Sequence, residues 1–174
     1  MRRKIITFFL IIIAFLLQST FFRSFTLLTI TPNLLLMLTA IFGFMNGKST
    51  GMWVGFFSGL MIDLFYCNLF GFHALVYMYI GYMNGMLYKV FFDEDIKVPI
   101  VLVAVSDLAY SLIYYLVLFA FRARLGFSAY LTHTILPEII FTALLTLVLY
   151  RPLFLLNKKL VAVEVEEQSP WLRR

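Results

Sequence analysis

The chain has 174 residues, of which 63% are apolar and 13% charged, with a mean hydropathy of +0.95 and a net charge of +5. Soluble domains are about 45–50% apolar and about 25% charged, so this composition excludes a soluble domain, a disordered chain and a fibrous repeat. It favours a protein that is solvated by lipid. Six spanning helices of about 20 residues would use most of the chain and leave no room for a folded soluble domain.

Six apolar segments follow one another along the chain, separated by short polar or charged turns. The first follows the basic stretch Arg2–Lys4, and because no small-x-small cleavage site follows it, we expect a retained helix rather than a signal peptide. We predict an all-α integral membrane protein with a six-helix domain over residues 1–151 and a mobile cytoplasmic tail over residues 152–174. The predicted helices span about residues 4–22, 32–45, 50–66, 72–92, 98–121 and 127–150.

The basic residues are distributed unequally between the two sides of such a bundle. Three of them fall in the predicted connections opposite the termini, namely Arg23, Arg122 and Arg124. Eleven fall on the side of the termini, namely Arg2, Arg3, Lys4, Lys48, Lys89, Lys97, Arg151, Lys158, Lys159, Arg173 and Arg174. Because short cytoplasmic loops carry an excess of Lys and Arg, we expect a multi-pass protein with both termini in the cytoplasm.

The third predicted helix carries glycines at intervals of four, at Gly51, Gly55 and Gly59, and Asp63 continues the spacing. Such spacing clears a groove into which another helix backbone can fit closely. Two interpretations are open: a packing groove inside the bundle, or a docking face formed by these four residues for the helix of a partner protein. Asp63 could also cap a neighbouring helix, and His73 is then its nearest partner.

Two further carboxyl groups, Asp107 and Glu138, fall inside the predicted fifth and sixth helices. An ionisable side chain at this depth costs roughly 2.5–3.5 kcal/mol, so each should face the bundle interior. Hydroxyl groups share the face of each carboxyl group. They are Ser111 and Tyr114 beside Asp107, and Thr134, Thr142 and Thr146 beside Glu138. The stripes indicate either interhelical hydrogen bonding or a path for protons or substrate.

A polar cluster is also expected in the outer half of the bundle, formed by Asn33, Asp63, His73 and His133. Catalysis is poorly supported, because no nucleophile lies beside a base and Ser58 lacks the glycine two residues earlier that an elbow motif requires. The histidines and the single cysteine have no metal-binding spacing. We expect no enzymatic activity, no cofactor, no metal and no nucleic-acid partner.

Three segments of the sequence carry a resemblance to a known family. They are Pro32-Asn33-Leu34-Leu35-Leu36, the run from Gly51 to Asp63 that reads Gly-x-x-x-Gly-Phe-x-x-Gly-Leu-x-x-Asp, and Gly71-Phe72-His73-Ala74-Leu75. Together with the length and the basic N-terminus, they resemble the rod shape-determining protein MreD family, most strongly over residues 32–85. That family usually has aspartate after the proline, where this chain has Asn33.

The resemblance implies a non-enzymatic scaffold of the cell-wall elongation machinery in the bacterial inner (cytoplasmic) membrane, controlling cell shape. It implies MreC as the direct partner, bound through its transmembrane helix. The RodA glycosyltransferase, a penicillin-binding transpeptidase and MreB would be reached through the complex.

The family also resembles the six-helix S-component fold of energy-coupling-factor transporters. A substrate-binding subunit of such a transporter is therefore the alternative function, with the outer polar cluster as its pocket. A vitamin pocket would need a lid, and the short outer connections favour the scaffold.

Overall fold

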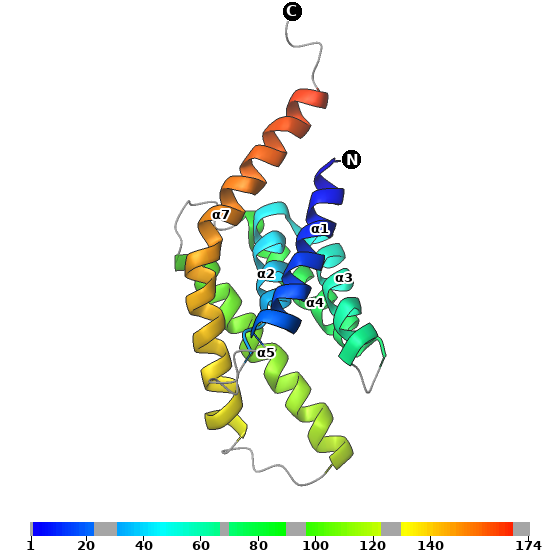
Figure 1. Ribbon diagram of the computed structural model, residues 1–174, viewed down its shortest axis with the longest axis vertical. Helices are drawn as coiled ribbons and strands as arrows, with labels where there is room; N and C mark the ends of the chain where they lie inside the picture. Colours follow the sequence, from blue (N-terminus) through cyan, green and yellow to red (C-terminus); the bar gives the residue numbers. More distant parts are fainter. Residues whose placement is uncertain (1, 23–30, 67–69, 90–96, 123–129, 169–174) are drawn as a thin grey trace, which may run out of the picture.

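The structure is a computed structural model that describes residues 2–22, 31–66, 70–89, 97–122 and 130–168, all of them helical or in short connections. Within these ranges six α-helices run alternately up and down, so that the start of α1 and the end of α7 lie at the same end of the bundle (Figure 1). The α-helices are α1 (Arg2–Leu16), α2 (Leu34–Asn46), α3 (Lys48–Tyr66), α4 (Phe72–Met86), α5 (Lys97–Arg122) and α7 (Leu136–Gln168). Shorter helical turns are η1 (Leu17–Phe22), η2 (Leu87–Lys89) and η3 (Leu131–Ile135).

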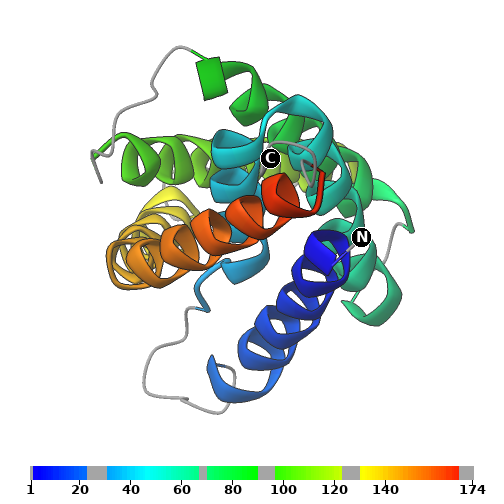
Figure 2. The ribbon, with the colours of Figure 1, turned by 90° about the horizontal axis from the view of Figure 1, so that it is seen from above.

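Helix α2 is the centre of the bundle. It packs against α1, α3, α4, α5 and α7, and in the view from above the other helices surround it (Figure 2). Every residue from Leu34 to Phe44 is buried, as expected for a helix that is apolar on all sides. Its start is capped by Asn33, whose side-chain oxygen accepts a hydrogen bond from the Leu36 backbone N–H at 3.3 Å.

Helices α3 and α4 form the most intimate pair. The glycine face of α3 lies directly on the α4 backbone: Gly55 contacts Tyr77, and Gly59 contacts His73 and Ala74. A Cβ added at Gly55 would lie 2.6 Å from the carbonyl carbon of Tyr77, too close for any real side chain. Gly51 meets Gly81 in the same way, one further step along both helices.

The predicted docking of a partner helix on Gly51, Gly55 and Gly59 therefore needs correction, because α4 of the same chain already covers these glycines. The face is a packing groove inside the bundle, which was the other of the two interpretations. The spacing identified a closely approached face correctly. It carried no information on which helix approaches.

The last helix differs from the prediction at its end. The sequence predicted a helix that stops at residue 150, whereas α7 continues through Arg151 and Pro152 to Gln168 and changes direction along its length (Figure 1). Pro152 removes one backbone hydrogen bond and bends a helix without necessarily ending it. At about 1.5 Å per residue the 33 residues of α7 extend about 50 Å, longer than the ~30 Å hydrocarbon core of a bilayer.

Three stretches of the described chain are long and apolar enough to cross a membrane by themselves: Arg3–Thr20, Lys97–Val117 and Leu131–Val163. Helix α2 is apolar but has only 13 residues. Large apolar side chains are exposed around the bundle, for example Ile140 and Leu144 on α7. A surface of this kind suits lipid rather than water, so the chain is a membrane protein.

The close contact of α3 with α4 generates a prediction. Gly55→Leu should lower the free energy of unfolding by about 3 kcal/mol or more, because the added side chain meets backbone that cannot move aside. Thermal unfolding of the purified protein in detergent measures the effect. The control Leu64→Phe enlarges an exposed position of the same helix and should change little. Equal stability of the two variants would contradict the packing described here.

Candidate functional site

Asp63, at the end of α3, caps the start of α4. Its carboxylate accepts hydrogen bonds from the backbone N–H groups of His73 at 3.2 Å and Ala74 at 2.9 Å. The ring Nδ1 of His73 lies 2.8 Å from the same carboxylate, so a proton on Nδ1 bridges the two side chains. Gly71, the residue before α4, has a φ of +92° and no side chain with which to cap the helix. Asp63 therefore supplies the negative charge that the helix start favours.

Aromatic rings extend this cap toward the centre of the bundle. The ring of His73 lies 6.0 Å from that of Tyr110, between centroids, and Tyr110 meets Tyr77 edge to face at 5.2 Å. The hydroxyl of Tyr77, which is completely buried, donates to the side-chain oxygen of Asn33 at 2.7 Å. Asn33 and the Asp63–His73 pair are thus joined through two tyrosines rather than directly.

Asn33 connects four helices. Its backbone N–H donates to the Thr142 hydroxyl on α7 at 3.2 Å, and its side-chain NH₂ donates to Asp107 on α5 at 3.5 Å. Asp107 is completely buried, and its second oxygen, Oδ2, makes no hydrogen bond with the described residues. Ser111 shares the helix face of Asp107, but its hydroxyl makes no hydrogen bond with the described residues, so it does not satisfy the Asp107 carboxyl group.

Two threonines near Glu138 donate hydrogen bonds within their own helix, and Thr142 also accepts the bond from Asn33. Thr142 donates to the backbone oxygen of Glu138 at 2.8 Å, and Thr146 donates to that of Thr142 at 2.7 Å. Such bonds satisfy hydroxyl groups within a buried helix face. Both threonines are buried, so they pack against the bundle interior.

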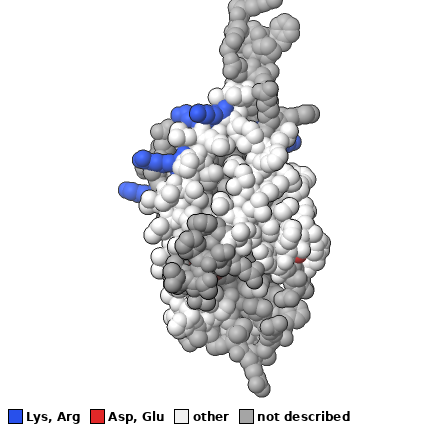
Figure 3. All heavy atoms as spheres, in the orientation of Figure 1, with Lys and Arg blue, Asp and Glu red and all other residues white. Residues whose placement is uncertain are grey.

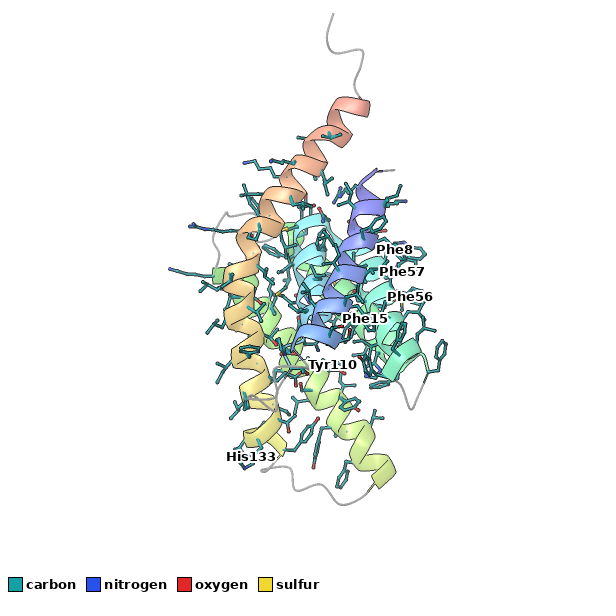
Figure 4. The ribbon with its side chains drawn as sticks, in the orientation of Figure 1. Phe8, Phe15, Phe56, Phe57, Tyr110 and His133 are labelled. Carbon is teal, nitrogen blue, oxygen red and sulfur yellow. The ribbon has the colours of Figure 1, made fainter. Side chains whose placement is uncertain are left out.

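A cavity of about 400 Å³ lies beside this network, between η1, the start of α2, the end of α3 and the facing sides of α4, α5 and α7. Figure 4 labels Phe15 and Tyr110, which line it from α1 and α5. Its volume falls within the range of roughly 300–1,000 Å³ that is typical of binding pockets. Its polar side chains include Gln18, Ser19, Thr31, Asn33, Tyr77 and Glu138. We call this feature the polar cavity.

The four residues predicted to form an outer cluster are only partly brought together. Asp63 and His73 are in contact, and Asn33 is linked to them through the tyrosines. His133 is exposed in η3, and Figure 4 places it near the lower end of the bundle, away from Tyr110. His133 is therefore not part of the cluster in this structure.

Three residues of the network were not predicted, namely Gln18, Tyr77 and Tyr110. Gln18 on η1 accepts a hydrogen bond from the Leu35 backbone N–H at 3.2 Å and joins the first helix to α2. Tyr77 lies four residues after His73 and four before Gly81, on the face of α4 that meets α3. That shared spacing was the available signal, because it places Tyr77 among residues that face the interior.

The charges are separated along the bundle. In Figure 3 the visible Lys and Arg side chains lie in the upper half of the bundle, mostly on the left, and the other described residues on this face are almost all uncharged. The polar cavity lies in the opposite half, because its residues come from the end of the first helix, the end of α3 and the start of α7. No group of three or more His, Cys, Asp or Glu residues in the described chain could hold a metal ion. The chemistry that this site offers is hydrogen bonding.

The cap on α4 generates a prediction. Asp63→Asn should lower the free energy of unfolding by about 1–3 kcal/mol, because an amide oxygen can replace only one of the two acceptor atoms. His73→Phe, the control, keeps both backbone hydrogen bonds and should cost less. Thermal unfolding in detergent gives both values. A larger loss for the His73 variant would contradict the assignment of Asp63 as the cap.

Comparison with known proteins gives one result. The sequence pattern of the rod shape-determining protein MreD family matches residues 1–160. No curated protein and no solved structure matches the chain. The match covers α1 to α5, α7 as far as residue 160, and every residue of the polar network described above. The chain belongs to the MreD family, whose role is in rod shape determination.

Proposed function

We propose that this protein is a non-enzymatic scaffold of the cell-wall elongation machinery, and that it binds MreC at the polar cavity. Membership of a shape-determining family supports the role in the machinery. The observation that supports the binding site is the cavity itself, whose walls offer polar side chains such as Gln18 and Ser19 for hydrogen bonding. The glycine face of α3, the other candidate, is covered by α4.

The cavity suits a segment of polypeptide. Its walls combine aromatic rings such as Phe15 with amide and hydroxyl groups such as Gln18 and Ser19. Thr31 and Tyr66, which also line it, are exposed, so the cavity can be reached from outside the bundle. Mixed apolar and polar walls of this kind favour a chain that inserts side chains and also pairs its backbone groups.

In this proposal the protein lies in the bacterial inner membrane with both termini in the cytoplasm. All six α-helices cross or enter the bilayer within a domain of residues 1–151, and the chain beyond it is cytoplasmic. The position of the visible basic side chains in the upper half of the bundle supports this orientation. Helices α3 and α4 lack the length or hydropathy of free-standing spans, and their mutual packing supports their insertion as a pair. The resulting six-helix arrangement would correspond to the S-component fold.

With this orientation the polar cavity faces the periplasmic side, where membrane-proximal segments of a single-span partner emerge from the bilayer. RodA, the penicillin-binding transpeptidase and MreB would then join through the same complex. Asp63 and His73 act by positioning the start of α4, and hence Tyr77, at the cavity wall.

A second candidate is favoured by one observation. The cavity volume of about 400 Å³ also suits a small molecule held by Asn33, Tyr77 and Glu138. A substrate-binding subunit of an energy-coupling-factor transporter would have such a pocket, and it would associate with ATPases and a coupling membrane protein.

Capture of partners from native membranes separates the two functions. We expect MreC to dominate the proteins that co-purify with the tagged chain. Ser19→Phe should reduce this recovery roughly tenfold, because a phenyl ring in the cavity would weaken binding by about as much as the loss of one buried contact. Quantitative mass spectrometry measures it.

The matched control is Thr20→Phe, which places the same ring at the next residue, an exposed position that does not line the cavity. This variant should recover MreC as well as the parent does. Recovery of ATPases and a coupling subunit instead would establish the transporter function. Equal recovery of MreC by both variants would exclude the cavity as the binding site.

A further inference from the structure

A second cavity lies at the opposite end of the bundle, between the starts of α1 and α3. Its volume is about 490 Å³, larger than that of the polar cavity. The two cavities share no residue, so the second is a separate feature of the fold. We call it the basic groove.

One end of the groove is cationic. Arg3 and Lys4 line it from α1, and Ser49 and Thr50 line it from the first turn of α3. Lys4 and Ser49 are exposed. No Asp or Glu is among the described residues that line the groove. Two cations with two hydroxyl donors match the chemistry of a phosphodiester group.

The rest of the groove is apolar and aromatic. Phe8 and Phe57 meet edge to face at 5.8 Å between ring centroids, and Trp53 stacks on Phe57 at 6.0 Å. Figure 4 shows Phe8 and Phe57 side by side on α1 and α3, below the start of α1. Trp53 is 55% exposed and Phe8 40% exposed, so this wall opens onto the surface that faces lipid.

We propose that the basic groove binds an anionic phospholipid, with its phosphate at Arg3 and Lys4 and an acyl chain along Phe8, Trp53 and Phe57. The charge at one end and the aromatic wall below it are arranged in the same order as the headgroup and the chain of a lipid. Tryptophan favours the level of the headgroup region, which fits the position of Trp53 near the basic end. Basic pockets between helices at the cytoplasmic surface are typical headgroup sites.

The fluorescence of Trp53, which lines the groove, can report whether a lipid is bound there. The chain has two tryptophans, so the full-length Trp171→Phe protein carries Trp53 as its single reporter. We would reconstitute it in phosphatidylcholine vesicles that contain either brominated phosphatidylglycerol or the same mole fraction of brominated phosphatidylcholine. Bromine quenches the fluorescence of a neighbouring tryptophan, and both leaflets carry the lipid, so the result is independent of orientation.

The proposal predicts stronger quenching by phosphatidylglycerol, with a relative binding constant that rises roughly fivefold for each of the two cations. Arg3→Gln with Lys4→Gln should bring the ratio close to one. The control pair Lys158→Gln with Lys159→Gln removes two charges from α7, outside the groove, and should keep the preference.

Ser49→Leu provides a variant that leaves every charge in place and obstructs the groove, and it should also reduce the preference. Equal quenching by the two lipids in the parent would overturn the proposal. So would a preference that survives both the Arg3–Lys4 double variant and Ser49→Leu. These outcomes do not depend on MreC, so the lipid site can fail while the scaffold function stands.

Discussion

The contact between the backbones of α3 and α4 is the constraint on which the rest of the structure depends. In a bilayer, helix association gains little from the hydrophobic effect, so close van der Waals packing has to hold the helices together. The glycines of α3 allow that approach, and Gly81 on α4 matches them. Two helices that are individually poor membrane spans thereby form one well-packed unit against α2.

The position of the polar network follows from this pair. Because α4 lies so close to α3, the first turn of α4 reaches Asp63, which caps the helix. The interior face of α4 also places Tyr77 within hydrogen-bonding distance of Asn33 at the start of α2. Asn33 then connects to Asp107 on α5. The polar cavity is the space left beside these connections, while the cationic end of the bundle holds a groove of different chemistry. The two ends therefore suit different ligands.

The sequence predicted local features well, because they depend on composition and spacing. It identified six helical segments and the closely packed face of α3. It could not identify α4 as the helix on that face, or Asn33 as the partner of Asp107, because both depend on how distant helices cross. The end of α7 was missed because Arg151 and Pro152 were taken to end the helix, whereas α7 continues through both. His133 was placed in the cluster by expected depth alone, which does not determine the direction of a side chain.

The central claim, that MreC occupies the polar cavity, is tested most directly by photocrosslinking in native membranes. A photoreactive amino acid at Thr31, at the cavity, would be compared with the same amino acid at Leu144 and at Leu147, on the exposed face of α7. The account predicts an adduct with MreC from Thr31 and none from the two α7 positions. Adducts from α7 with none from Thr31 would contradict it and place the partner on the outer surface of the bundle.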